Sequence, residues 1–235
     1  MQRHRIAARR QTSFGAKVVR LFSSRIIRWN DAKRYNAMAD PQPTKTQPTR
    51  KPAHVLFFAA VPPDQIKDQI AEAWRSTGTG ESFRRETLHM SLLAIAGLDM
   101  LDPILVDRAQ RAALAVRHSP FELRFDRLMT FGGQPGNSAL VIGTDGHNHH
   151  PNDLSMGLHH ALKSVGLVPP NRKKVTPHLT LAYGPGFSHK RHLIKPICWT
   201  IRDFTLVDSL QGQGRHVPLG TWPLIESGPQ PGFDF

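Results

Sequence analysis

Two short stretches of the chain repeat one pattern: Leu88-His89-Met90-Ser91-Leu92 and Pro177-His178-Leu179-Thr180-Leu181. Each holds a histidine, an apolar spacer and a hydroxyl residue, set among apolar residues. Side chains in a β-strand alternate between the two faces of the sheet. We therefore expect the histidine and the hydroxyl of each stretch to share one face, while the spacers Met90 and Leu179 point into a core. Two such strands predict one site with approximate two-fold symmetry.

The length and composition set limits on the class of protein. A chain of 235 residues accommodates one large domain or two small ones, and either can bury a proper core. The single cysteine, Cys198, excludes an internal disulfide and a cysteine-rich metal site. The sequence contains no apolar run of about 18 residues, so we expect no membrane span.

The basic charge is concentrated at the N-terminus. Residues 1–37 hold ten Lys/Arg and one acidic residue, a net charge of +9, whereas residues 38–235 hold 21 Lys/Arg and 17 Asp/Glu, a net charge of +4. The larger part is therefore only mildly basic, which is compatible with an anionic substrate.

The N-terminal arm has three interpretations. Its high content of Arg and Ser and its scarcity of acidic residues resemble a mitochondrial transit peptide. A second interpretation is a basic arm that binds nucleic acid. Alternatively, translation begins at Met38 and residues 1–37 are an upstream extension. Residues 40–52 contain four prolines and no apolar periodicity, which indicates a disordered linker. We predict a disordered basic extension at residues 1–52, one folded domain at 53–226 and a tail at 227–235, in a cytoplasmic, monomeric protein.

Apolar patterns and turn residues predict ten elements in the folded part. Helices are expected at residues 64–75 and 103–116, and from a cap at Asn152 or Asp153 to residue 165. Strands are expected at residues 54–61, 86–96, 121–131, 138–143, 176–183, 199–210 and 216–224. Helices mixed with hairpins favour the α+β class, and the two motif strands fall in corresponding halves. This arrangement indicates two similar lobes that face each other.

The chain resembles the 2H phosphoesterases. Within this superfamily it resembles the LigT/ThpR group of RNA 2′,3′-cyclic phosphodiesterases, once called 2′-5′ RNA ligases. The resemblance covers residues 54–224. It rests on the two motifs, with support from Leu56-Phe57-Phe58-Ala59 and Phe204-Thr205-Leu206-Val207-Asp208-Ser209. Ser91 stands where the family more often has Thr, and Leu-Ala-Ile-Ala-Gly at residues 93–97 lacks the usual aromatic residue before the glycine. The resemblance implies a two-lobed, pseudo-symmetric fold of antiparallel sheets flanked by helices, with the site in the cleft between the lobes.

The chemistry of the motifs fits opening of a cyclic phosphodiester. This reaction needs a base that deprotonates water and an acid that protonates the leaving ribose oxygen, and imidazole titrates in the right range for both. We expect His178 to be the base and His89 the acid, while Ser91 and Thr180 donate hydrogen bonds to the non-bridging phosphate oxygens. The chemistry requires no metal, and we expect no cofactor. By resemblance, the product is a 2′-phosphate, and the same site can run backwards as weak 2′-5′ ligation.

Other residues have both functional and structural interpretations. Contact with RNA phosphates is one interpretation, and a solvated surface the other, for Arg84, Arg85, Arg172, Lys173 and Lys174. Phe57 and Phe58 either stack on a base or pack in the core. The histidines at 147, 149, 150, 159 and 160 match no ordered ligand spacing, so we expect no metal there.

Two alternatives to hydrolysis of RNA ends remain open from the sequence. One is a 2H phosphodiesterase for another cyclic nucleotide or for an ADP-ribose cyclic phosphate. The other is an RNA end-binding protein that keeps the pocket without turnover. For hydrolysis of RNA ends, the expected partner is RNA with a terminal 2′,3′-cyclic phosphate, with no membrane involved.

Overall fold

The computed structural model describes residues 51–79, 81–131, 138–170, 174–185, 187 and 192–225. The predicted N-terminal arm up to residue 50, the tail from residue 227 and the candidate cations Arg172 and Lys173 lie outside these described residues. The boundaries predicted for the folded domain therefore stay predictions.

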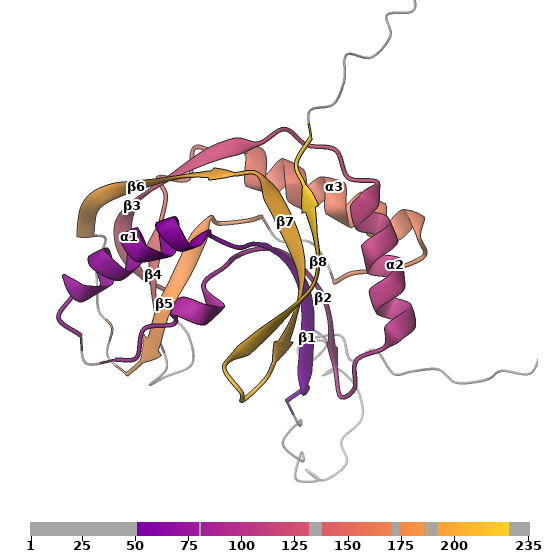
Figure 1. Cartoon of the computed structure of the whole chain (residues 1–235), viewed down its shortest axis with the longest axis horizontal. Coiled ribbons are helices and arrows are strands. Elements are labelled where there is room, and N and C mark those ends of the chain that lie inside the picture. The colour runs from indigo at the N-terminus through magenta and orange to yellow at the C-terminus, as the bar shows by residue number, and fades with distance from the viewer. Residues whose placement is uncertain are drawn as a thin grey trace, which may run out of the picture.

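Eight strands and three α-helices make up the described part of the chain (Figure 1). The first half contains β1 (His54–Ala60), α1 (Asp64–Arg75), a 3₁₀ turn (Arg85–Thr87), β2 (Met90–Leu98) and α2 (Pro103–Leu114). The second half contains β3 (Phe121–Phe131), β4 (Ser138–Gly143), α3 (His150–Ser164), β5 (His178–Gly184), β6 (His192–Ile201), β7 (Asp203–Leu210) and β8 (Arg215–Pro223).

The strands form two four-stranded antiparallel sheets, one for each lobe. Sheet A has the order β2-β1-β7-β8, and sheet B has the order β5-β4-β3-β6. The two motif strands, β2 and β5, are thus edge strands of their own sheets, and they contact each other. This confirms the expected α+β fold with two pseudo-symmetric lobes.

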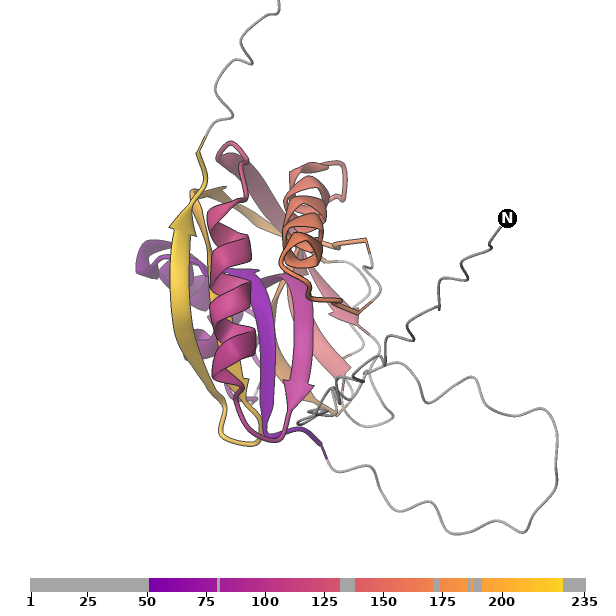
Figure 2. The ribbon, with the colours of Figure 1, turned by 90° about the vertical axis from the view of Figure 1, so that its right-hand side faces the viewer.

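The helices tie the two lobes together, because two of them pack across to the other lobe. Helix α1 follows β1 of sheet A but lies against β6 of sheet B, and α3 follows β4 of sheet B but contacts β2 and α2 (Figures 1 and 2). Buried side chains from both sheets and all three helices consequently form one continuous core, which includes Phe58, Phe125 and Phe204. No helix within the described residues is long and apolar enough to span a membrane.

Sheet A buries side chains on both faces, in unequal amounts. Leu56, Phe58 and Ala60 of β1 enter the main core, whereas Phe57 and Ala59 alternate to the other face and form a small cluster with Val207. This second face also carries Ser91 of the first motif, which lies opposite Ala59.

Three predicted element boundaries are wrong. The first motif strand begins at Met90 rather than at residue 86, because residues 85–87 form a 3₁₀ turn closed by the Thr87 N–H and the Arg84 carbonyl, 3.2 Å apart. The single strand expected at residues 199–210 is two strands, β6 and β7. Helix α3 begins at His150, so neither Asn152 nor Asp153 is its cap.

Candidate active site

Both motif histidines are held by the same local hydrogen bond. The Nδ1–H of His89 donates to the carbonyl oxygen of Thr87 at 2.8 Å, and the Nδ1–H of His178 donates to the carbonyl oxygen of Thr176 at 2.7 Å. A carbonyl oxygen only accepts hydrogen bonds, so in each neutral ring the proton sits on Nδ1 and Nε2 keeps its lone pair. Each imidazole is therefore oriented by the backbone two residues upstream, with the lone pair of Nε2 directed away from that carbonyl.

The hydroxyl residues share the face of their histidines, as the strand alternation predicts. The Ser91 hydroxyl donates to His89 Nε2 at 3.1 Å. Thr180 lies opposite Val141 of β4, on the same face as His178. The spacers Met90 and Leu179 point the other way and are fully buried, which confirms the predicted division of the two faces.

The surroundings of the two motif histidines lower the pKa values of both. Burial lowers the pKa of His89, the hydrogen bond to the Thr87 carbonyl opposes this shift, and the positive charges of Arg84 and His178 lower it further. Burial likewise lowers the pKa of His178, against the effect of the Thr176 carbonyl. The contact between β2 and β5, together with the effect of His178 on the pKa of His89, brings the two motif histidines near each other. An anionic phosphate in the cleft would raise both pKa values again and restore a proton to one ring.

A third histidine, His216 of β8, completes the imidazole cluster. Its ring centroid is 4.9 Å from that of His89 and 5.7 Å from that of Phe57, in edge-to-face contacts. Burial, followed by the charges of His89 and Arg84, lowers the pKa of His216 to about 4. His216 is therefore neutral near pH 7 beside a catalytic candidate. Sequence reasoning missed it because only the pairing of His216 with Ser209 of β7 brings it to this face.

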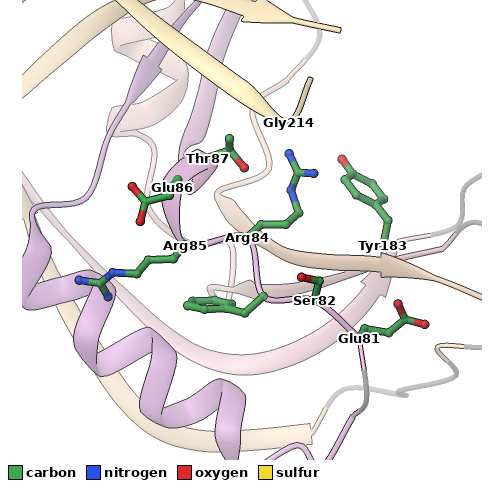
Figure 3. Close-up of a pocket in the computed structure, with 9 residues that line it drawn as sticks. Glu81, Ser82, Arg84, Arg85, Glu86, Thr87, Tyr183 and Gly214 are labelled. Carbon is green, nitrogen blue, oxygen red and sulfur yellow. The ribbon is translucent and has the colours of Figure 1, made fainter. Parts of the chain in front are cut away.

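Arg84 lies beside the histidines and lines a cavity of about 580 Å³ (Figure 3). Its guanidinium carbon is 5.0 Å from the centroid of the Tyr183 ring, a cation–π contact between the segment before β2 and the strand β5. Its backbone N–H donates to the Leu181 carbonyl at 2.9 Å. The cavity extends to Gly214 in the β7–β8 turn and thus lies between the lobes.

The other candidate contacts are placed unequally. Arg85 turns away from Arg84 toward α1 (Figure 3) and pairs with Asp68 at 2.8 Å, so its charge is already partnered. Lys174 is exposed just before the second motif. Phe57 contacts His89 at 5.0 Å between ring centroids, whereas Phe58 is fully buried against Phe204 and Trp222. Phe58 is thus not placed to stack on a base.

Asn152 supports the second motif from outside the cleft. Its side-chain carbonyl accepts from the Val175 N–H at 2.7 Å, and its side-chain amide donates to the Val175 carbonyl at 3.3 Å. The segment that presents Thr176 and His178 is therefore clamped to the first turn of α3. The local pattern around Asn152 indicates only a capping role, and nothing in it links this residue to one so far along the chain.

Comparison with known proteins agrees with this fold. Residues 62–213 match the family model of the 2′-5′ RNA ligase superfamily. The fold is similar to Escherichia coli LigT solved with 3′-AMP, at 21% identity and a TM-score of 0.58, over 75% of this chain and 100% of that one. A structure described as a phosphoesterase is similar at 22% identity and a TM-score of 0.59, with the same coverage. The protein TT0787 of Thermus thermophilus is similar at 20% identity and a TM-score of 0.57, over 72% of this chain and 97% of that one. No curated protein matched.

The fold and the twin motifs define a 2H phosphoesterase of the LigT type. The chain belongs to the 2′-5′ RNA ligase superfamily, whose model covers more than half of its length. This membership supports phosphodiesterase chemistry in the cleft.

Proposed function

We propose that the protein hydrolyses terminal 2′,3′-cyclic phosphates of RNA to 2′-phosphates, and that the same site runs the reverse 2′-5′ ligation weakly. The observation that carries the proposal is the matched anchoring of His89 and His178, each with Nδ1–H on a carbonyl and with Nε2 directed away from it. Two imidazoles of equal reach, one from each lobe, suit a reaction with a proton donor and a proton acceptor on opposite sides of phosphorus.

The proposed reaction is an in-line displacement with a balanced pair of proton transfers. His178 Nε2 removes a proton from water as the water oxygen attacks phosphorus opposite the ribose 3′-oxygen. The bond between phosphorus and the 3′-oxygen breaks, and His89 donates its Nε2 proton to that oxygen. The products are a 2′-phosphate and a free 3′-hydroxyl, and one proton has moved from His89 to the product while His178 has gained one from water.

The motif hydroxyls complete the phosphate site in this proposal. The Ser91 hydroxyl donates to His89 Nε2 when this ring is neutral. Once His89 is protonated, Nε2 becomes a donor, so Ser91 accepts from it and turns its own proton toward a non-bridging oxygen. Thr180 supplies the equivalent donor from the other lobe. Donors aimed at the oxygens where charge develops stabilise the transition state.

Arg84 is the cation best placed to bind the substrate. Its guanidinium is held by Tyr183, lines the cavity between the lobes and lies near enough to His89 and His216 to lower their pKa values. We assign it to a phosphate of the RNA strand that approaches through this cavity. Lys174 extends the positive rim on the side of the second motif.

The reaction is proposed to be metal-independent. In the described parts of the chain, the cleft brings together no three metal-ligating side chains within 4.8 Å of one another. The histidine pair also supplies both the acid and the base that the reaction requires.

The test is product formation from a short RNA ending in a 2′,3′-cyclic phosphate, followed by ³¹P NMR. Appearance of the 2′-phosphate resonance, absent with the purified His89→Ala/His178→Ala double variant, is the expected result. A 3′-phosphate product would contradict the assigned leaving group. Turnover restricted to an ADP-ribose cyclic phosphate or a cyclic mononucleotide would identify a different 2H phosphodiesterase, and tight RNA binding without turnover would identify an end-binding protein.

A further inference from the structure

A second cluster of ligating side chains lies outside the cleft, at the start of α3. His150 and Asp153 of its first turn lie beside His118, which comes from the connection between α2 and β3. One ligand atom from each residue lies within 4.8 Å of those from the other two, and all three residues are partly buried. The histidines between residues 147 and 160 match no ordered site in the sequence because the third ligand, His118, is distant in the chain.

The hydrogen bonds leave the ligand atoms of this cluster available. His118 donates its Nδ1–H to the Ser119 carbonyl at 2.7 Å, so Nε2 keeps a free lone pair. Metal-binding histidines are commonly oriented by a hydrogen bond of this type. Among the residues that the structure describes, no hydrogen bond engages the ring nitrogens of His150 or the carboxylate of Asp153.

The spacing of His150 and Asp153 along α3 also allows both side chains to bind the same ion. Residues three apart on a helix lie on one face, so His150 and Asp153 point to the same side. His149 adds a third imidazole, with its ring stacked on His150 at 4.4 Å and its Nε2 3.6 Å from the Asp153 carboxylate. Packing on Phe121 accounts for the positions of the His118 and His150 rings. It does not account for a carboxylate converging on both of them.

We propose that His118, His150 and Asp153 form a zinc site, with His149 or water as the fourth ligand. Imidazole and carboxylate ligands in this ratio favour zinc over calcium or magnesium, which prefer oxygen donors. Tetrahedral zinc holds its nitrogen and oxygen ligands at about 2.0–2.2 Å, and hence roughly 3.3 Å from one another. Side-chain rotations that draw the atoms together by roughly 1.5 Å therefore complete the site.

The ion would act as a structural clip rather than as a catalyst. It would join the α2–β3 connection to the first turn of α3. Nearby, Asn148 just before α3 donates to the carbonyl of Glu122 in β3 at 2.8 Å. The same turn carries Asn152, which clamps Val175 before the second motif. A bound ion that stabilises this turn raises the melting temperature of the folded protein, as any ligand of the native state does.

The experiment is zinc titration of tag-free, metal-stripped full-length protein, followed by melting temperature and by the visible spectrum of the Co²⁺-substituted form. The variants are His118→Ala and the near-isosteric Asp153→Asn. The matched controls are His160→Ala, an exposed histidine of the same helix, and the His89→Ala/His178→Ala double variant, which removes the imidazoles of the cleft.

We expect wild type and both controls to gain melting temperature with zinc and to show tetrahedral Co²⁺ bands. His118→Ala and Asp153→Asn should weaken zinc binding by at least about tenfold, as loss of a ligand interaction does. Wild-type zinc affinity in Asp153→Asn, whose melting temperature without metal reports its folding, would overturn the assignment. So would loss of binding in the cleft double variant, because the ion would then occupy the catalytic histidines.

Discussion

A fixed charge at position 216 offers a direct test of the role of His89. The two rings are 4.9 Å apart between centroids, and the low pKa of His216, about 4, keeps it uncharged near pH 7. His216→Glu introduces a negative charge there and His216→Lys a positive one. His216→Gln is the matched neutral control.

The size of the effect follows from this distance. Two unit charges at the 4.9 Å separation of the rings interact by about 3.4 kcal/mol at an effective dielectric constant of 20, and by about 0.8 kcal/mol in bulk water. At about 1.36 kcal/mol per pKa unit, these limits correspond to shifts of roughly 2.5 and 0.6 units. His89 is half-buried and faces the cleft, so we expect a shift of about one unit.

The assay is kcat/KM as a function of pH with a cyclic mononucleotide, which avoids contributions from a longer RNA strand. The alkaline limb of such a profile reports the pKa of the catalytic acid in the free enzyme, and the acidic limb reports that of the base. If His89 is the acid, His216→Glu moves the alkaline limb up by about one unit, because a carboxylate favours the imidazolium. His216→Lys moves the same limb down, and His216→Gln leaves it in place.

Opposite shifts from opposite charges separate electrostatics from damage to the fold. Movement of the acidic limb instead would mean that His89 is the base and that the assignment of roles is reversed. Shifts in the same direction for Glu and Lys, or none in either, would refute the reasoning. Circular dichroism and melting temperature of all three variants establish that the compared proteins are folded.

Four further outcomes are expected. His89→Ala and His178→Ala each lower kcat by about 100-fold or more with little change in melting temperature; near-normal turnover by either folded variant would contradict the acid–base pair. Hydrolysis persists after thorough chelation, even where the melting temperature falls, and rescue of lost activity by one divalent ion would disprove metal independence. RNA binding weakens more steeply with salt than binding of a cyclic mononucleotide, since each neutralised phosphate releases counterions; equal slopes argue against an RNA track. A protein beginning at Met38 keeps its melting temperature, and its single-turnover rate stays within about tenfold; a larger loss would make the arm part of the enzyme.

Most of the fold could be predicted because its strands are either continuous apolar runs, as in β1, or alternate between buried and exposed residues, as in β3. β6 shows where these signals weaken. In β6 the apolar residues Ile197 and Trp199 are buried, but Leu193, on the same face, is exposed and breaks the pattern, and the strand also contains Pro196. A strand can contain proline at the edge of a sheet, where one row of backbone groups has no partner. β6 is such an edge, next to β3 alone, which accounts for the proline within it.

The candidate site could be predicted only where its chemistry lies along the chain. His89 with Ser91 and His178 with Thr180 are visible because each pair spans three residues. His216 enters the cleft through the register between β7 and β8, which no local pattern encodes. Arg84 and Arg85 are equivalent in sequence, yet one stacks on Tyr183 and the other pairs with α1.

The orientation of each motif histidine and the distance between the two histidines therefore depend on different parts of the structure. Each motif imidazole is oriented by a carbonyl two residues upstream, so the short motif sets the orientation of its own histidine in both lobes. The distance between the two Nε2 atoms depends instead on how the lobes meet. The hydrogen bond from the Arg84 N–H to the Leu181 carbonyl spans this junction, joining the segment before the first motif to the strand of the second. Arg84 thus contributes twice, since its backbone helps to set the spacing of the proposed acid and base while its guanidinium lines the cavity between the lobes.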